Sequence, residues 1–431
     1  MRNVSVWRAV LGVENAVVED VEVDDAAEVV VAHVRPRRAG RGRCGLCGAK
    51  APWYDGGEGR RRWRGLDLGT MRVFLEAEAP RVNCRVHGPT VRQVPWARHG
   101  AGHTRCFDAQ VAWLATQCSK SAVTELMRIA WRTVGSIIAR VWTDIAAGFD
   151  ALAGLHRIGI DEISYKRRHK YLTVVVDHDS GRLVWAAPGR DRAAVRAFFD
   201  ALEASGAGRC AQITHVSADG AEWIADVVTE RCPGAIRCAD PFHVVGWATD
   251  ALDAVRREAW SNARRAPGNT RPHGWAHGRR ATVSTGAAQK LRRARYALWK
   301  NPENLTERQQ AKLAWIAQTD PRLYRAYLLK EGLRTIFKLP ADQAAEALDH
   351  WVAWARRCRI DSFVTLQRRI VAHRTEILAS IEHGLSNGLT ESVNTKIRLL
   401  TRIAFGFANP EPLIALAMLT LGGHRPTLPG R

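Results

Sequence analysis

The hydrophobic positions along the chain change period several times, and each change predicts a different kind of element. Within the first 34 residues, two Val-rich runs at 17–23 and 28–34 alternate apolar and polar positions, a pattern that predicts a β-hairpin. Between residues 107 and 146, apolar side chains recur every three or four positions, which predicts helices. The N-terminal third therefore combines a small β module with helices.

A second pattern begins at residue 157 and mixes strands with helices. Three apolar runs in succession predict strands at 157–161, 171–176 and 182–187. The pattern then predicts helix, strand, helix and strand at 193–204, 212–217, 222–230 and 235–239. This order is typical of an α/β fold with a mixed sheet. From 244 to about 383 the periodicity is almost wholly helical.

The distribution of charge along the chain indicates a binding partner. The 431-residue chain carries 64 Lys and Arg against 43 Asp and Glu, a formal net charge of +21. Residues 35–105 hold 16 bases and 5 acids, and residues 256–300 hold 12 bases and 1 acid. Because phosphate contacts scale with the number of bases, both zones favour a nucleic acid partner. In the second zone the bases are expected to grip a DNA backbone together with Trp260, Trp275 and Trp299; a solvated helical face or a disordered loop is the alternative.

Several classes of protein are excluded by what the chain lacks. No stretch approaches 18 consecutive apolar residues, so no membrane partner is expected. The first residues do not form a basic segment followed by a long apolar one, so no export signal is expected. The chain has nine cysteines, an odd number, and they are scattered along the sequence. This pattern argues against a disulfide framework and favours a protein of the reducing cytoplasm.

Two short pairs of metal-ligand residues, with 36 residues between the pairs, are Cys44 with Cys47 and Cys84 with His87. Two residues separate the members of each pair, a spacing that lets one tight turn point both side chains at one ion. Four sulfur and nitrogen ligands favour a closed, structural Zn²⁺ site. The alternative is two unrelated pairs in a cysteine-rich chain. Small core residues are expected at Cys106, Cys118, Cys210, Cys232, Cys238 and Cys358.

Two short amphipathic helices are predicted close together after Cys118. Ser119 is placed to cap the first, over 122–128, and the second begins near Arg132. Such a pair is typical of a helix-turn-helix module, which lays its second helix in the major groove. An ordinary helical linker is the alternative. The side chains expected to reach DNA are those of Trp131, Arg132, Thr133 and Ser136.

Three carboxylates occupy positions that catalysis explains better than surface duty does. Asp161 lies in or just after an apolar strand, where an unpaired charge is costly, and Asp219 follows another strand. Glu391 shares one face of a predicted helix with Asn394 and Arg398, opposite the apolar stripe. If these elements pack together, the acids would hold two Mg²⁺ (or Mn²⁺) ions about 3.5–4 Å apart, suited to in-line attack at phosphorus.

Other acids compete for the role of second ligand. Asp240 follows the last predicted strand and is the main rival of Asp219. We prefer Asp219, because Asp240 and His243 together have the pattern of a polar brace beside the site, and His243 can also contact phosphate. Glu162 is adjacent to Asp161 but points to the opposite face of a strand.

These motifs together resemble those of the ISL3 family of bacterial insertion-sequence transposases, over nearly the whole chain. They include the zinc pairs, the helix-turn-helix, Gly159-Ile-Asp161-Glu162, Asp240-Pro-Phe-His243 and Thr390-Glu391-Ser-Val-Asn394-Thr-Lys396-Ile-Arg398. The resemblance implies a ribonuclease-H-like core that a helical insertion interrupts, with a DDE triad at Asp161, Asp219 and Glu391. It also implies that the N-terminal modules bind the element's terminal inverted repeats. His87 stands where related chains often carry Cys, and either residue ligates zinc.

We therefore expect a multidomain α/β protein that acts as a DNA transposase. It would bind double-stranded inverted repeats as a homo-oligomer at the nucleoid, cleave phosphodiester bonds with metal ions and join 3′-hydroxyl ends to target DNA. Lys396 and Arg398 are further candidates for DNA contact. A zinc-binding regulator without catalysis and a metal nuclease of the same fold are the alternatives. The expected domains are a β-hairpin and zinc module at 1–105, a helix-turn-helix at 106–150, the first part of the core at 151–243, the helical insertion at 244–383, the final core helix at 384–421 and a disordered tail at 422–431.

Overall fold

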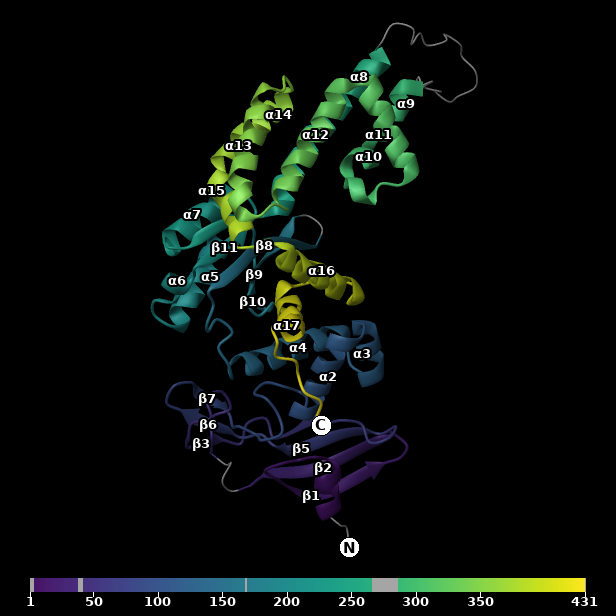
Figure 1. The fold of residues 1–431 in the computed structure, drawn as a ribbon. Coiled ribbons are helices and arrows are strands. Elements are labelled where there is room, and N and C mark those ends of the chain that lie inside the picture. The colour runs from purple at the N-terminus through teal and green to yellow at the C-terminus, as the bar shows by residue number, and fades with distance from the viewer. Residues whose placement is uncertain (1–3, 38–41, 167–168, 266–285, 431) are drawn as a thin grey trace, which may run out of the picture. The chain divides into compact units, whose positions relative to one another are not determined.

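The computed structural model describes residues 4–37, 42–166, 169–265 and 286–430. The chain forms two compact units. Figure 1 shows the ribbon coloured by residue number. One unit is made of residues 1–151 together with 397–431, and the other of residues 152–396. Each unit has its own hydrophobic core.

The N-terminal part of the first unit is a β module. β1 (Ala16–Asp24) and β2 (Val29–Pro36) form the predicted antiparallel hairpin. The residues before it form a helix, α1 (Val4–Val10), rather than part of the alternating pattern. The remaining strands are β3 (Trp53–Asp55), β4 (Arg60–Arg64), β5 (Arg72–Glu78), β6 (Arg81–Cys84) and β7 (Gly88–Val91). They complete a four-stranded sheet of order β1-β2-β5-β4 and a three-stranded sheet of order β3-β6-β7.

Three helices follow the β module: α2 (Arg105–Gln117), α3 (Lys120–Met127) and α4 (Trp131–Ala146). The Ala122 N–H donates to Ser119 Oγ at 3.2 Å, so Ser119 caps α3 as predicted. Arg128 ends that helix in the left-handed conformation, with φ at 51°.

The C-terminal helix α17 (Pro410–Leu421) packs against α4 and α2, and it therefore belongs to the first unit. The division between the two units falls inside α16 (Gly388–Ile403), between residues 396 and 397, and so within the predicted core segment 384–421. Residues 422–430 form no helix or strand, and the His424 ring stacks on Phe149 with 3.5 Å between ring centres.

The second unit is built on the predicted mixed sheet. Its strands are β8 (Arg157–Lys166), β9 (Lys170–Asp177), β10 (Leu183–Pro188), β11 (His215–Ala218) and β12 (Ile236–Ala239). Their order is β10-β9-β8-β11-β12, with antiparallel pairing among the first three and parallel pairing of β11 with β8 and β12. This order is that expected of a ribonuclease-H-like core.

Two predicted strand boundaries were wrong. β8 runs to Lys166, beyond the predicted end at residue 161, so Asp161 lies in the strand, which is one of its two predicted positions. Gln212 ends a short helix, α6 (Arg209–Gln212), and β11 begins only at His215. One face of the sheet is covered by α5 (Arg192–Ser205) and α7 (Glu222–Arg231), whose apolar side chains share a core with those of β8.

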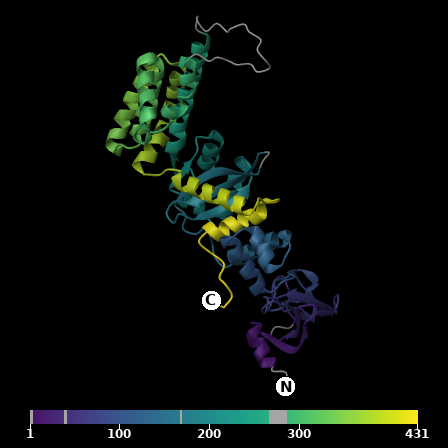
Figure 2. The ribbon, with the colours of Figure 1, turned by 90° about the vertical axis from the view of Figure 1, so that its right-hand side faces the viewer.

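The segment after β12 is helical, as the periodicity predicted. Its elements are α8 (Pro241–Arg265), α9 (Gly286–Arg292), α10 (Arg295–Trp299), the 3₁₀ turn η2 (Pro302–Asn304), α11 (Glu307–Thr319), α12 (Pro321–Ile336), α13 (Ala341–Arg357), α14 (Asp361–Ala372) and α15 (Arg374–Glu382). Figure 2 shows its long helices lying side by side. They share one apolar core, which begins at Ala239 and Val244 and so continues from the end of the sheet. In the described parts of the chain, no helix combines the length and the apolar character needed to span a membrane.

Candidate active site and metal centre

The four predicted zinc ligands form one cluster in the first unit. The sulfur atoms of Cys44, Cys47 and Cys84 and a ring nitrogen of His87 all lie within 4.8 Å of one another. Cys47 Sγ is 3.7 Å from Cys84 Sγ, and His87 Nδ1 is 3.7 Å from the sulfur atoms of Cys44 and Cys84. Tetrahedral zinc with the usual bond lengths separates its ligand atoms by roughly 3.5–4 Å. The donor set and its spacing therefore fit a zinc ion.

Tight turns position these ligands. The Gly48 N–H donates to the Cys44 carbonyl at 2.9 Å, and Gly48 has a φ of 70°, in the region that favours glycine. At the second pair, the backbone N–H groups of His87 and Val86 point at Cys84 and lower the pKa of its thiol to about 6. A lower pKa favours the thiolate, which is the form that binds metal.

The three predicted catalytic acids come from different elements. Asp161 is inside β8, Asp219 directly follows β11, and Glu391 is in the first turn of α16. Asp161 and Asp219 are half-buried, whereas Glu391 is exposed. Among the described residues, only the four predicted zinc ligands form a group of three or more His, Cys, Asp or Glu side chains whose ligand atoms all lie within 4.8 Å of one another. The three predicted catalytic acids do not form such a group. Ionised carboxylates repel one another, and a bound cation would favour their closer approach.

Both oxygens of Asp161 accept hydrogen bonds. Asn394 Nδ2 donates to Oδ2 at 2.8 Å, and the Glu162 N–H donates to Oδ1 at 2.8 Å. Burial raises the pKa of Asp161, the charge of Asp219 adds to this effect, and the positive charge of His243 opposes it. Asn394 is 2 % exposed, whereas Glu391 and Arg398, which the helical spacing places on the same side of α16, are exposed.

Gly159 lets α16 approach the sheet closely. A Cβ at this position would lie 2.4 Å from Thr390 Oγ1 and 2.9 Å from His178 Nε2. Thr390 is fully buried and stands immediately before Glu391. The sequence analysis missed this contact, although a glycine inside a strand is a signal of close approach.

Asp240 anchors the start of α16. It is 3 % exposed, and its carboxylate accepts from His243 Nδ1 at 2.7 Å and from the Asn387 N–H at 3.1 Å. Burial opposes ionisation, but the hydrogen bonds from His243 and Asn387 outweigh it and hold the pKa of Asp240 below its usual value. The Asn387 side chain also accepts from Ser217, whose hydroxyl lies 2.7 Å from His178 Nε2. The sequence analysis did not find this network, which holds the residues before α16 against the ends of two strands.

Glu162 has surroundings different from those of Asp161. Its side chain is 5 % exposed, and its Oε2 lies 3.6 Å from Arg190 Nε. Burial raises the pKa of Glu162 to about 7, and the charge of Asp219 adds to this shift. Glu162 is therefore a buried acid with one cationic neighbour rather than an exposed residue.

The predicted DNA-contacting side chains of α4 stand at its first turns. Trp131, Arg132 and Ser136 are exposed, and Thr133 is half-buried. No side chain caps the start of α4. Lys120 Nζ lies 4.7 Å from the centre of the Trp131 ring, so one part of that ring already has a cationic partner. Lys396 and Arg398, which lie on α16, are both exposed.

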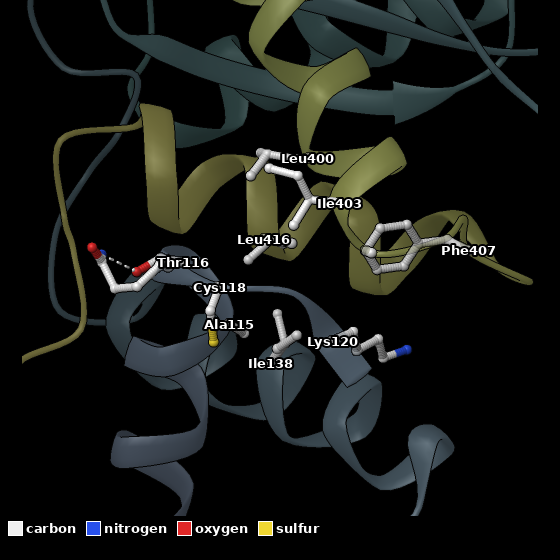
Figure 3. A pocket seen from close by; sticks show the side chains of 11 residues that line it. Ala115, Thr116, Cys118, Lys120, Ile138, Leu400, Ile403, Phe407 and Leu416 are labelled. Carbon is white, nitrogen blue, oxygen red and sulfur yellow. Dashed lines mark hydrogen bonds between the residues drawn. The ribbon is translucent and has the colours of Figure 1, made fainter. Parts of the chain in front are cut away.

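A small apolar pocket lies in the first unit between the helix-turn-helix and the C-terminal segment (Figure 3). Its volume is about 40 Å³, and its walls include Ala115 and Ile138 on one side and Leu400, Ile403 and Leu416 on the other. This space is far below the several hundred cubic ångströms that an organic ligand needs. The pocket therefore records the packing of the C-terminal segment on the helix-turn-helix.

Several bases of the two basic zones are paired within the protein. In the first zone, Glu76 pairs with Arg60 at 2.8 Å and with Arg62 at 2.6 Å. In the second zone, Arg256 is 8 % exposed and pairs with Asp253 at 2.8 Å. These arginines are therefore partly neutralised before any nucleic acid binds.

The tryptophans of the second zone that the structure describes lie beside arginines. Arg264 lies over the Trp260 ring at 5.0 Å, and Arg295 lies over the Trp299 ring at 3.7 Å. Trp275 lies outside the described residues. The interleaving of bases and aromatic rings in this zone is thus a set of local stacking contacts.

Comparison with known proteins identifies three parts of the chain. A model described as "Transposase", of the DDE ISL3 type, matches residues 158–417. A model described as the helix-turn-helix domain of transposase family ISL3 matches residues 92–142. A model described as the zinc-finger of transposase IS204/IS1001/IS1096/IS1165 matches residues 40–87. These matches confirm the predicted zinc module, helix-turn-helix and catalytic core.

Relatives extend the match to the full chain. The transposase for insertion sequence element IS1557, from two strains of Mycobacterium tuberculosis, is 66% identical over 441 residues and covers 100% of this chain and 98% of its own. The transposase for insertion sequence element IS1001 from Bordetella parapertussis is 26% identical over 356 residues, or 81% of this chain and 82% of its own. The Drosophila P element transposase strand transfer complex is a distant structural neighbour, with a TM-score of 0.34, 10% identity and coverage of 74% of this chain and 91% of that one. The family matches and the full-length relatives together show that the chain belongs to the ISL3 family of insertion-sequence transposases, DDE enzymes that cleave and join DNA.

Proposed function

We propose that Asp161, Asp219 and Glu391 are the catalytic triad of this transposase. The observation that carries the proposal is the direct contact between the helix of the third acid and the strand of the first, since Asn394 on α16 donates to Asp161 on β8 at 2.8 Å. Asp219 is near enough for its charge to act on Asp161. Glu391 stands one turn before Asn394 on the same helix and is exposed, so its side chain is free to turn toward the other two.

The same acids are the proposed ligands of two divalent cations, Mg²⁺ or Mn²⁺. Carboxylate oxygens are the ligands that such hard cations prefer. The site fits a cation because burial and neighbouring acids both disfavour a bare negative charge on Asp161. Bound there, the ions would lower the pKa of an attacking water or 3′-hydroxyl and neutralise charge on the leaving oxygen.

The protein's own groups have separate tasks in this proposal. Asn394 orients Asp161, while Asp240 and Asn387 hold the start of α16 beside the sheet. The hydrogen bond to Asp240 raises the pKa of the His243 imidazole and so favours a positive charge next to the acids. Asp240 therefore acts as a brace rather than as the second metal ligand, and His243 can contact a DNA phosphate.

The N-terminal modules are the proposed reader of the element's ends. Cys44, Cys47, Cys84 and His87 would hold one structural Zn²⁺, and α4 would enter the major groove of double-stranded inverted repeats. Base or phosphate contacts would come from Trp131, Arg132, Thr133 and Ser136, with backbone contacts from Lys396 and Arg398. Pairing the two ends of an element calls for a homo-oligomer on DNA, and the proposed place of action is the nucleoid.

Cleavage of labelled inverted-repeat DNA with Mg²⁺ tests the triad. Asp161→Asn and Asp219→Asn are expected to bind DNA normally but to lose nicking and joining. The matched control is Asp226→Asn, because Asp226 is an exposed acid on α7 that pairs with Arg192 and should leave activity unchanged. Retained cleavage in either triad variant would overturn the assignment. Nicking by the wild type without joined product would favour a nuclease, and binding without nicking would favour a regulator.

A second experiment separates Asp219 from Asp240. Asp240→Asn is expected to lower the melting temperature, because Asp240 is buried and anchors α16, and to leave Mn²⁺ affinity little changed. Asp219→Asn should do the reverse. Isothermal titration with Mn²⁺ and thermal unfolding measure both quantities, and a loss of Mn²⁺ binding only in Asp240→Asn would exchange the two roles.

A further inference from the structure

Arg369 is a cation of the helical insertion that lies beside one of the proposed catalytic acids. It is an exposed residue on α14, and its guanidinium carbon lies 3.6 Å from the centre of the Trp247 ring on α8. A Cβ at Gly220 would lie 2.7 Å from that ring and 3.8 Å from Arg369 Nη2. Gly220 directly follows Asp219, so the ring and the guanidinium pack against the chain where β11 ends.

The guanidinium is held in place without being neutralised. Stacking on an indole face fixes the plane of an arginine while leaving its N–H edge open. In the described parts of the chain, no carboxylate lies within ion-pair distance of Arg369. Nearby arginines differ, since Arg374 makes two 2.9 Å bonds to Asp349 and Arg237 lies 2.6 Å from Glu376.

Asp219 is the acid whose charge acts on Arg369. Partial burial lowers the pKa of the guanidinium, and the charge of Asp219 opposes that shift. Asp219 itself accepts the Ala221 N–H at 3.0 Å, a contact local to its own turn. The guanidinium of Arg369 therefore lies near Asp219 in a fixed orientation and forms no salt bridge with it.

We propose that Arg369 binds a non-bridging oxygen of a DNA phosphate at the catalytic site, and that Trp247 holds the guanidinium in the orientation this contact needs. The inference rests on the proposed function of Asp219. A planar guanidinium offers two parallel N–H donors that match two phosphate oxygens. Through this contact the insertion supplies a positioning group to a site whose own side chains are mainly acidic.

The first test is single-turnover cleavage of labelled element-end DNA with Mg²⁺. Arg369→Ala is expected to slow cleavage about 10²-fold, as loss of one charge-stabilising donor does. Arg369→Lys should recover only part of the rate, because it keeps the charge but not the planar fork. Arg368→Ala is the matched control, since Arg368 is the neighbouring exposed arginine on the same helix. Thermal unfolding of all three variants is expected to match the wild type.

The second test asks whether the lost contact is to phosphate. Methylphosphonates, which are uncharged, replace single phosphates near the cleaved bond one at a time. One position should slow the wild type and Arg368→Ala but not slow Arg369→Ala further, because that variant has already lost the partner group. A structural role for the stacked pair would instead leave Arg369→Ala equally sensitive at every position, and this result would overturn the inference.

Asp219→Asn separates this inference from the proposed triad. If Asp219→Asn abolishes cleavage while Arg369→Ala cleaves like Arg368→Ala, the triad stands and the role of Arg369 is wrong. If Asp219→Asn leaves cleavage intact, the proposed function of that site is wrong. Both are supported if Asp219→Asn abolishes cleavage and Arg369→Ala is slow, with an unchanged melting temperature and lost methylphosphonate sensitivity.

Discussion

The zinc cluster and the acidic site are assembled in opposite ways. The zinc ligands come from two local turns, and all four ligand atoms already lie within 4.8 Å of one another. The three acids come from a strand, the residue after another strand and a helix, 58 and 172 residues apart. As a set they do not reach that distance among the described residues, and Glu391 is exposed.

The difference follows from charge and from the source of each ligand. The zinc ligands stand in two pairs, each on one tight turn, so local backbone geometry brings the members of a pair together. Ionised carboxylates repel one another, so their approach must be supported by the fold and completed by cations. The supporting contacts of the acidic site are Gly159 under Thr390, Asn394 on Asp161 and Asn387 on Asp240.

The largest expected effect breaks the zinc side of the comparison. Cys84→Ser should abolish stoichiometric zinc and unfold the β3-β6-β7 sheet, because Cys84 ends β6 and structural zinc contributes folding free energy directly. Metal analysis and limited proteolysis measure the two effects. Cys118→Ser is the control, since Cys118 is outside the cluster and should retain zinc. Full zinc occupancy in Cys84→Ser would contradict the assignment.

Gly159→Ala tests the acidic side. The added methyl would lie 2.4 Å from Thr390 Oγ1, so overpacking should cost about 1–3 kcal/mol in the free energy of unfolding and reduce cleavage. Gly234→Ala is the matched control, because a Cβ there meets nothing within 4 Å. Chemical denaturation measures both variants. The double variant Gly159→Ala/Thr390→Ala should recover part of the lost stability. Equal unfolding free energies for Gly159→Ala and Gly234→Ala would refute the close approach.

Asn394→Ala should loosen Asp161 without unfolding the protein. Removing a group that orients a metal ligand typically costs about 10–100-fold in affinity or activity. The readouts are Mn²⁺ affinity and the Mg²⁺ concentration that gives half-maximal cleavage. Thr395→Ala, on the exposed side of the same helix, serves as the control. Unchanged metal dependence in Asn394→Ala would mean that its hydrogen bond to Asp161 does not support the site.

His243→Gln should have the smallest effect, and the effect should depend on pH. The hydrogen bond to Asp240 raises the pKa of His243, so its stabilising contribution is complete below the unfolded pKa near 6.5 and is lost as the pH rises through the raised folded value. His243 is 41% exposed, so solvent screening limits the difference to about 1 kcal/mol or less. Unfolding free energies should differ between the two proteins at pH 5.5 and converge by pH 9. A constant difference over this range would show that the charge plays no part.

Much of the fold followed from local patterns in the sequence. The hairpin at β1 and β2, the helices on both sides of Ser119, the mixed sheet and the helical insertion all have apolar periods that depend on a few neighbouring residues. An error arose where the local signal was weak, at Gln212, which was predicted to begin a strand but ends a helix. The burial of Asn394 and its hydrogen bond to Asp161 were not predicted, because they depend on a carboxylate 233 residues away in the chain.

By itself the sequence determined the candidate zinc ligands, the acidic candidates, the family and the order of elements, since each depends on residue type, spacing or local periodicity. Only the tertiary structure decided that Gly159 makes room for Thr390, that Asp240 is saturated by Asn387 and His243, and that α17 belongs with the helix-turn-helix. It alone brought Arg369 to the turn that follows Asp219. These are contacts between residues far apart along the chain, which packing creates and no local pattern records.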